Sequence, residues 1–408
     1  MGPLHSARSK TLPPNDGIRV VLYSHDTFGL GHLRRSRALA SALTASGVAA
    51  SAIILTGSPV AGRFTFPEEV DHIRLPGVKK LEDGSYISQT GGMDIDQTTE
   101  LRAGIIQSSL ENYDPDLLIV DKEPTGFRGE LLGALEQLKA RRKCKLVLGL
   151  RDVLDEPAVL AAEWDRKNAI WATDTFYDEI WVYGPKSVYD PTAGLTLAAE
   201  TRRRIHWTGY LRREVVDAAD VPENPYILIT PGGGGDGKAM VDLVVSAYEK
   251  DPDLGPQARV VYGPFLSGDV REEFENRVAK LNGRIVSVGF DARIEALFAG
   301  AQGVVCMGGY NTFCEVLSFD KPAVIVPRTK PRLEQWIRAS RAENLGLVRM
   351  LDENRDGLTA DSMIKAIRSL PQQPKPSLTG ADGLMDGLDH VIERTRILLQ
   401  PPLRSVGA

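Results

Sequence analysis

The stretch that decides the fold is GVVCMGGYNTFCE, residues 303–315. An apolar run ends in the pair Gly308 and Gly309, a helix-like pattern begins at once, and Glu315 lies inside that helix. Free amides at a helix N-terminus, approached over glycines without side chains, favour a bound diphosphate. Glu315 would then lie within reach of ribose hydroxyls, which predicts a nucleotide-sugar site. An ordinary strand-glycine-helix turn is the alternative interpretation.

The composition indicates a cytoplasmic protein of two domains. The chain has 408 residues, of which 42% are hydrophobic and 25% charged, and its net charge is −5. It can therefore fill two cores, and it lacks the basic field that nucleic acid would require. Three cysteines lie in or beside apolar stretches without the spacing of a zinc site: Cys144, Cys306 and Cys314. We expect a reduced, cytoplasmic protein that does not bind nucleic acid and that can still touch a membrane surface.

Short β-branched runs alternate with helical periodicity along nearly the whole chain, which predicts parallel sheets covered by helices. A first series of strands is expected at residues 18–23, 50–56, 117–121, 145–150, 180–183 and 205–207. A second series is expected at residues 226–230, 260–262, 285–288, 304–306 and 323–326. The pattern predicts an α/β fold in which two Rossmann-like domains face each other across a cleft. Ligands of such sheets bind beyond the carboxyl ends of the strands.

Turn-forming residues divide the chain into five parts. We expect a flexible N-terminal arm over residues 1–17, a first Rossmann-like domain over 18–216, a linker over 217–225, a second Rossmann-like domain over 226–380, and a C-terminal helix with a tail over 381–408. The first domain should hold the acceptor and the second the nucleotide sugar.

The first strand runs into a glycine turn. Gly29 and Gly31 allow a tight bend, and His32 follows at the start of a basic helix. The helix dipole there disfavours protonation and leaves a neutral imidazole that can accept a proton. His32 is therefore the candidate catalytic base, although a lone histidine is often structural. His25 and Asp26 are the next candidates.

A second glycine turn, TPGGGGDGK, occupies residues 230–238. So many glycines are costly to order, and close approach of a phosphate explains them. Ala239 stands where a nucleotide-hydrolysing P-loop requires a hydroxyl residue, so that type of loop is not expected. A flexible surface loop is the alternative.

Two other polar pairs have more than one interpretation. Asp94 and Asp96 could hold a metal ion, but their polar surroundings favour a solvated loop or a lid on the acceptor side. Arg212 and Arg213 can reach the cleft and pair with phosphate, or can simply be solvated.

Taken together, these residues resemble the GT-B fold and in particular the peptidoglycan-forming, MurG-like N-acetylglucosaminyltransferases of glycosyltransferase family 28. Residues 306–315 are similar to the family segment C-x-S-G-x-x-T-x-x-E, with Gly308 in place of its Ser. The resemblance covers most of the chain and implies contacts to the base, the phosphates and the sugar hydroxyls. The candidate donor-binding residues are Gly29, Gly31, Arg213, Gly232, Gly233, Gly234, Gly235, Phe290, Asp291, Gly308, Gly309, Tyr310, Asn311, Thr312, Glu315, Glu334 and Gln335.

The chain departs from the family at two places. Its first glycine turn, FGLGHLRR over residues 28–35, is closer to the G-x-G-H-x-x-R turn of the nucleotide-sugar hydrolases of pseudaminic acid biosynthesis than to G-G-x-G-G-H. Glu334 replaces a glutamine of the sugar pocket. The family's donor and lipid acceptor therefore do not carry over together with its fold.

The expected function is transfer of a sugar from a nucleoside diphosphate sugar, with a UDP-sugar as first choice, to a small-molecule, glycan or lipid-linked acceptor. The resemblance implies inversion at the anomeric carbon, and His32 would deprotonate or orient the acceptor hydroxyl. Because the sequence offers no convincing set of metal ligands, we expect the transfer to need neither a metal nor a cofactor. Two alternatives are a nucleotide-sugar hydrolase and a non-catalytic nucleotide-sugar binding protein.

Overall fold

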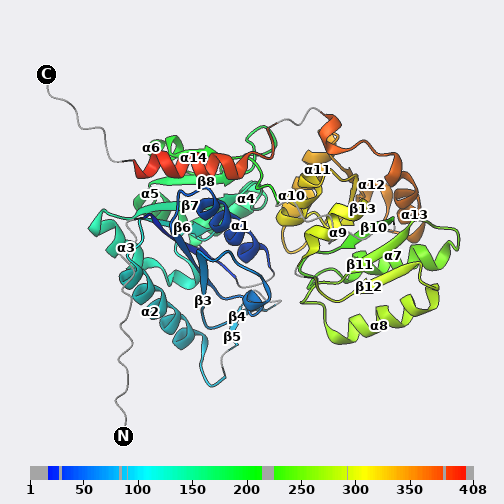
Figure 1. Cartoon of the computed structure of the whole chain (residues 1–408), viewed down its shortest axis with the longest axis horizontal. Helices are drawn as coiled ribbons and strands as arrows, with labels where there is room; N and C mark the ends of the chain where they lie inside the picture. Colours follow the sequence, from blue (N-terminus) through cyan, green and yellow to red (C-terminus); the bar gives the residue numbers. More distant parts are fainter. Residues whose placement is uncertain are drawn as a thin grey trace, which may run out of the picture.

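The computed structural model describes residues 17–26, 30–81, 85–89, 91–213, 225–291, 293–379 and 383–400. Two α/β domains lie side by side, each built on a parallel sheet with helices around it (Figure 1). The predicted fold class is confirmed. Residues 1–16 of the expected arm, Gly29 of the first glycine turn and residues 217–224 of the expected linker lie outside the described residues.

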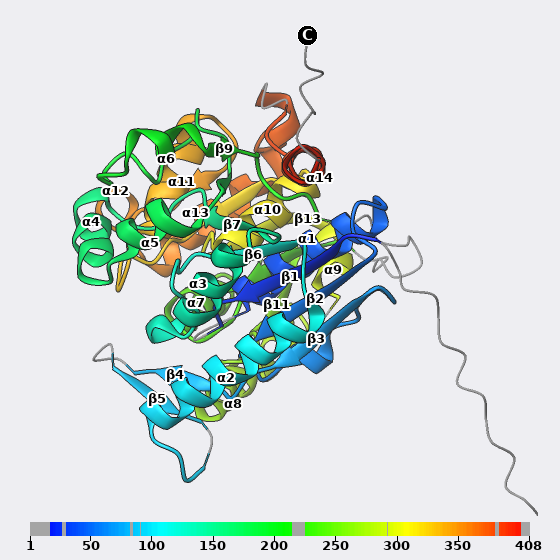
Figure 2. The same cartoon turned by 90° about the vertical axis from the view of Figure 1, so that its left-hand side faces the viewer.

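The first domain contains a seven-stranded parallel sheet in the order β3-β2-β1-β6-β7-β8-β9. Its strands are β1 (Arg19–Ser24), β2 (Ser51–Thr56), β3 (Val70–Arg74), β6 (Leu117–Asp121), β7 (Lys145–Arg151), β8 (Glu179–Tyr183) and β9 (Ile205–Trp207). Its helices are α1 (Gly31–Ala45), α2 (Ile95–Tyr113), α3 (Leu132–Arg141), α4 (Pro157–Arg166), α5 (Ala169–Phe176) and α6 (Ala199–Arg203). A hairpin of β4 (Val78–Lys80) and β5 (Tyr86–Ser88) projects from this domain beside α2 (Figure 2).

The second domain contains a six-stranded parallel sheet in the order β12-β11-β10-β13-β14-β15. Its strands are β10 (Tyr226–Thr230), β11 (Gln257–Val261), β12 (Ile285–Val288), β13 (Ala301–Cys306), β14 (Ala323–Ile325) and β15 (Arg349–Met350). Its helices are α7 (Lys238–Lys250), α8 (Gly268–Val278), α9 (Ile294–Gly300), α10 (Tyr310–Ser318), α11 (Glu334–Asn344), α12 (Glu353–Asp356) and α13 (Ala360–Ser369).

The central strands read as continuous apolar runs because both of their faces are covered. In β1, Val20 and Leu22 join one apolar cluster, whereas Val21 and Tyr23 join another on the opposite face. The cluster that contains Val20 also includes residues of the second domain, such as Tyr226. Apolar packing therefore continues through the junction of the domains.

Several strands differ from those expected. β11 begins at Gln257 rather than at residue 260, because the polar Arg259 lies over the ring of Tyr226, 4.5 Å from its centre, and so fits inside a strand. β3, β4, β5 and β15 were not predicted, being short or polar at the edges of their sheets. Asp94 and Asp96 are both exposed at the start of α2, where the side chain of Asp94 accepts from the backbone N–H of Gln97 and caps the helix.

The last helix that the structure describes returns to the first domain. The helix α14 (Gly387–Leu399) lies against the first domain, at the red end of the colour scale in Figure 1. The backbone N–H of Tyr210 donates to the carbonyl of Leu384 at 2.7 Å, and Arg394 pairs with Glu179. The two domains are therefore joined by two crossings of the chain.

In both sheets the strand order reverses beside the first strand, between β1 and β6 and between β10 and β13. Loops at the carboxyl ends of such neighbouring strands diverge and leave a crevice. Each of β1 and β10 leads into one of the glycine turns. The topology thus brings both turns to the junction of the domains.

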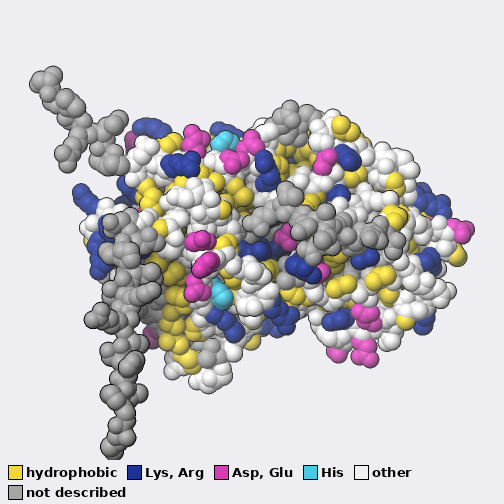
Figure 3. All heavy atoms as spheres, in the orientation of Figure 1, with side chains coloured by type: hydrophobic (Ala, Val, Ile, Leu, Met, Phe, Trp, Pro, Cys, Tyr) yellow, Lys and Arg dark blue, Asp and Glu magenta, His cyan; other side chains and the backbone are white. Residues whose placement is uncertain are grey.

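None of the helices in the described part of the chain combines the length and the apolar character needed to cross a membrane. Acidic and basic side chains are interspersed on the face shown in Figure 3, where a notch separates the two lobes at one edge.

Candidate active site

A cleft lies between the two domains and holds roughly 1100 Å³ of space when its open mouth is included. The candidate residues that line it are Gly31, His32, Gly232, Gly233, Gly235, Phe290, Asp291, Gly309, Tyr310, Asn311, Thr312, Glu315, Glu334 and Gln335. Arg213, Gly234 and Gly308 are not among the lining residues, and Gly29 lies outside the described residues.

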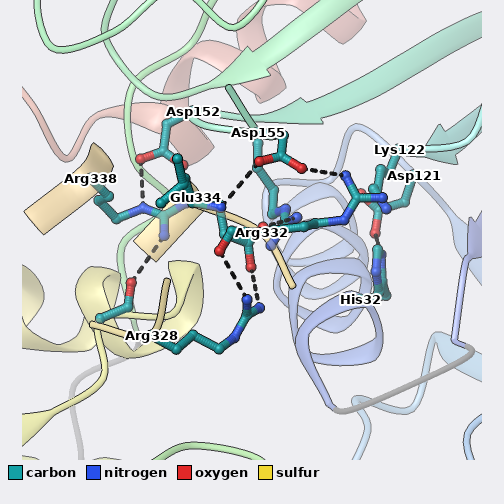
Figure 4. Close-up of polar contacts among 12 residues, drawn as sticks. His32, Asp121, Lys122, Asp152, Asp155, Arg328, Arg332, Glu334 and Arg338 are labelled. Carbon is teal, nitrogen blue, oxygen red and sulfur yellow. Dashed lines mark hydrogen bonds and ion pairs between the residues drawn. The ribbon is translucent and has the colours of Figure 1, made fainter. Parts of the chain in front are cut away.

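His32 lies in the first turn of α1, and its Nδ1 is 2.6 Å from Oδ2 of Asp121 (Figure 4). Asp121 ends β6, the strand beside β1 at the switch point. Arg35 donates to both oxygens of Asp121, at 2.8 and 2.6 Å, and fixes the carboxylate from its other side. Because Nδ1 is engaged, Nε2 is the nitrogen left to accept a proton.

Burial favours a neutral imidazole at His32, and neighbouring charges favour an ionised carboxylate at Asp121. Burial lowers the pKa of His32, and Asp121 offsets that effect only in part. Burial acts to raise the pKa of Asp121, but Arg35 and His32 outweigh it and hold the pKa well below its usual range. A lowered pKa fits the neutral imidazole expected of the candidate base, and the carboxylate of Asp121 that orients the ring was not predicted.

The two alternative bases have other surroundings. Asp26 accepts from the backbone N–H of Leu33 at 3.2 Å and from the hydroxyl of Thr56, so it holds the start of α1. His25 is buried, burial holds its pKa well below the usual value, and its ring packs edge-on against His32 with 5.7 Å between ring centres. Neither residue lines the cleft.

The second glycine turn brings backbone, rather than side chains, to the cleft. Gly232 and Gly233 line it directly. Gly234 has φ +89°, and a Cβ at this position would lie 2.2 Å from the carbonyl oxygen of Tyr262. Only glycine fits there, so the loop can pass close to its neighbour and present its amides to a ligand.

The helix α10 begins at the cleft without a side-chain cap. Gly309 precedes it, and no side chain accepts from its first amides. Gly308 has φ +73°, and a Cβ there would meet Ile325 at 2.7 Å, so the turn into the helix also requires glycine. The uncapped N-terminus lines the cleft through Tyr310 and Thr312 and offers positive potential to an anion.

Asn311 of α10 connects the second domain to the first glycine turn. Its Nδ2 donates to the carbonyl of Gly31 in the first domain at 2.9 Å. Arg213 donates to Oδ1 of Asn311 at 2.6 Å. Arg213 thus positions Asn311, which lines the cleft, without lining the cleft itself. Its neighbour Arg212 instead pairs with Asp386 near α14.

Phe290 and Asp291 lie at one end of the cleft. Phe290 packs edge-on against Phe64 of the first domain with 6.2 Å between ring centres, and Arg63 lies over its ring. Asp291 accepts from the backbone N–H of Arg293 at 2.8 Å. An apolar ring beside backbone groups suits a flat base.

Glu334 begins α11 between two arginines. It accepts from Arg151 of the first domain at 2.6 Å and from Arg328 at 2.9 Å (Figure 4). Burial acts to raise the pKa of Glu334, but these arginines hold it at about 2. Gln335 accepts from the backbone N–H of Arg328 at 3.1 Å. Glu334 is therefore a fixed carboxylate, able to accept from sugar hydroxyls.

Glu315 is fully buried in α10, and Arg34 of the first domain is its ion-pair partner. Burial raises the pKa of Glu315, and Arg34 offsets this effect in part. Within the described residues, no group of His, Cys, Asp or Glu side chains is arranged to hold a metal ion. Asp94 caps α2 and Asp96 pairs with Arg128 instead.

Residues that the sequence analysis missed include Arg34, Arg35 and Arg151, which line the cleft, and Asp121, which pairs with His32. Asp121 and Arg151 each end a strand that was predicted, and a polar residue at the carboxyl end of a buried parallel strand was the available signal. The partners of Arg34 and Arg151 lie on the opposite domain, so no local pattern pointed to them.

Comparisons with known proteins agree with this geometry. Residues 227–383 match the glycosyltransferase family 28 C-terminal domain. A segment of 129 residues is 27% identical to the UDP-N-acetylglucosamine--N-acetylmuramyl-(pentapeptide) pyrophosphoryl-undecaprenol N-acetylglucosamine transferase of Rhodococcus erythropolis and covers 32% of each chain. The transferase of the same name from Desulforudis audaxviator is 25% identical over 167 residues, 38% of this chain and 42% of its own length. These alignments span less than half of either relative.

Two solved structures are similar over nearly their whole length. The calicheamicin glycosyltransferase CalG4 is 16% identical, with a TM-score of 0.56 over 96% of this chain and 100% of its own. A UDP-glucosyltransferase from Polygonum tinctorium is 12% identical, with a TM-score of 0.65 over 94% of this chain and 99% of its own. The chain has the GT-B fold, the two-domain fold of these glycosyltransferases. The match to the glycosyltransferase family 28 C-terminal domain falls on its second domain.

Proposed function

We propose that the protein is a glycosyltransferase that moves a sugar from a nucleoside diphosphate sugar, a UDP-sugar first, to an acceptor hydroxyl bound by the first domain. The observation that carries this proposal is the pair His32 and Asp121, which shares one cleft with the uncapped N-terminus of α10 and the second glycine turn. Such a transfer requires a general base that deprotonates the acceptor and a binding site that stabilises the departing diphosphate.

The reaction proceeds as a direct displacement with inversion. The acceptor hydroxyl gives its proton to Nε2 of His32 while its oxygen forms the new bond to the anomeric carbon. The bond between that carbon and the diphosphate oxygen breaks, and its electron pair leaves with the nucleoside diphosphate. Amides of the glycine turn and of α10 stabilise the charge that develops on the leaving group.

The donor is held by the second domain. Phe290 packs on the base, Glu315 binds the ribose hydroxyls, and Glu334 with Gln335 accepts from the sugar hydroxyls. The glycine amides and the helix N-terminus can perform the charge stabilisation that a metal ion performs elsewhere, so we propose a metal-independent reaction in the cytoplasm. The acceptor is a small molecule, a glycan or a lipid-linked sugar.

The test is incubation of the protein with a panel of nucleoside diphosphate sugars, with and without a panel of acceptors, while released nucleoside diphosphate is measured. Release that depends on an acceptor supports the proposal. Release at the same rate without any acceptor identifies a hydrolase, and binding without release identifies a binding protein. Each release assay is repeated with His32→Ala, which should lower the rate by about 100-fold or more if the cleft is responsible.

A further inference from the structure

Arg34 crosses the cleft from α1 of the first domain to two carboxylates of the second. Its Nη2 donates to Oε1 of Glu295, in the first turn of α9, at 2.8 Å. The same nitrogen is in contact with Oε1 of Glu315 in α10. Arg34 and Glu315 both line the cleft. One guanidinium is therefore shared between two acidic side chains at the place proposed for the ribose.

The two carboxylates do not share Arg34 equally. Glu295 receives a well-aligned hydrogen bond, and although burial acts to raise its pKa, Arg34 outweighs burial and the pKa is lowered. Glu315 is 0% exposed, and neither of its oxygens accepts a well-aligned hydrogen bond from the described residues. A buried carboxylate without such bonds is costly, and it favours any ligand that brings hydroxyl donors.

We propose that Arg34 gates the donor site. In this structure Arg34 forms ion pairs with both Glu315 and Glu295. When the vicinal hydroxyls of a nucleoside diphosphate bind Glu315, they displace Arg34, which then pairs with Glu295 alone. Glu295 is the partner that retains Arg34 after the exchange. This inference rests on the proposed function, because it assigns to Glu315 the ribose of a nucleotide donor.

The gate predicts opposite effects for two substitutions that each remove one charge. Arg34→Gln removes the competitor at Glu315, so a nucleoside diphosphate should bind more tightly. Glu295→Gln removes the alternative partner of Arg34, so Arg34 should remain on Glu315 and binding should weaken. Each change should be about tenfold in Kd, the order of one charge-assisted hydrogen bond. A residue that simply binds the donor cannot produce this pair of results.

The experiment is calorimetric titration of wild type and variants with UDP, or with whichever of dTDP, GDP, ADP and CDP wild type binds. Arg277→Gln is the control, because Arg277 also bridges two carboxylates, Asp242 and Glu249, but does not line the cleft. Its affinity should equal that of wild type. Thermal unfolding checks that each variant is folded. If Arg34→Gln does not fold, Arg34→Lys replaces it, and its affinity for the nucleoside diphosphate should rise by a smaller factor.

Tighter binding by Arg34→Gln together with weaker binding by Glu295→Gln supports the gate. Weaker binding by Arg34→Gln shows that Arg34 is itself a donor ligand and overturns the gate while leaving the proposed function intact. Unchanged affinity in both variants also overturns it, since the ion pairs would then only join the domains. If no nucleoside diphosphate binds wild type, the proposed function fails and the gate fails with it.

Discussion

Asp152 and Arg338 face each other across the domain junction with both side chains 0% exposed. Arg338 donates to the two oxygens of Asp152 at 2.8 and 2.6 Å, and its remaining nitrogen donates to the carbonyl of Gly308 at 3.0 Å (Figure 4). Gly308 forms the turn that leads into α10. Through these bonds Arg338 connects Asp152 of the first domain to the backbone of Gly308, beside the proposed diphosphate site.

The first prediction concerns this buried pair. Asp152→Ala leaves Arg338 charged and unpaired inside the junction, so the free energy of unfolding should fall by about 3 to 5 kcal/mol. Urea unfolding of wild type and variant measures the loss. The double variant Asp152→Ala with Arg338→Ala should lose less than the sum of the two single variants, because the second change removes the stranded charge. Strict additivity would show that the pair is not energetically coupled.

The second prediction concerns His32. His32→Ala or His32→Asn should lower kcat by about 100-fold to 10,000-fold, the usual contribution of general base catalysis. The Kd for the nucleotide, measured by calorimetry, should change little, because the second domain holds the donor. Loss of donor binding with turnover per bound complex preserved would make His32 a donor ligand and move the search for the base to His25 and Asp26.

The third prediction is a pH dependence. His32 must be neutral to act, and its pKa lies below the usual 6.5, so the acid limb of kcat/KM should fall below pH 6.5. Asp121→Asn removes the negative charge that raises this pKa and leaves Arg35 unpaired beside the ring. The limb should therefore move to still lower pH while the plateau drops by about 100-fold or more. A limb that moves upward would contradict this role of Asp121.

The fourth prediction links Glu334 to stability. Its pKa is about 2 in the folded protein and about 4.3 in an unfolded chain, which corresponds to about 3 kcal/mol of stability. Because folding lowers the pKa of Glu334, its ionised form stabilises the fold fully at pH values above the pKa of the unfolded chain. This stability is lost as the pH falls through the pKa of the folded protein. Glu334→Gln should thus destabilise the protein by about 3 kcal/mol at pH 7 and by only about 1 kcal/mol at pH 3. Equal losses at both pH values would exclude a role for the charge.

The fifth prediction is that transfer survives chelation. Treatment with EDTA should leave the initial rate unchanged within error, because amides and arginines surround the proposed diphosphate site. Arg128→Gln, which frees Asp96 outside the cleft, should behave like wild type in the same assay. A rate lost with EDTA and restored by manganese or magnesium would contradict the proposal.

The fold could be predicted because its signals are local. Buried parallel strands such as β6 are short apolar runs, and a helix such as α1 shows its amphipathic period directly. The strands β3 and β15 were missed because edge strands bury only part of their surface and tolerate residues such as Asp71. Packing against neighbours, rather than the residues themselves, defines them as strands.

The site was predictable only where it is made of contiguous residues. The glycine turns and His32 are such features, and their placement at the cleft follows from the strands that precede them. Asp121 lies 89 residues from His32, and Glu334 lies 183 residues from Arg151. The first pair meets only when β1 and β6 become neighbours in one sheet, and the second only when the two domains pack together. A single sequence contains no signal for the geometry of that packing.

The return of α14 to the first domain makes that domain discontinuous in sequence. Val391 of this helix is fully buried in the cluster that also contains Leu39 of α1. A ribosome therefore releases the last piece of the first domain only after the whole second domain has emerged. The second domain can complete its sheet during synthesis, whereas the first must wait, with the apolar surface beneath α14 uncovered, until α14 itself has been made.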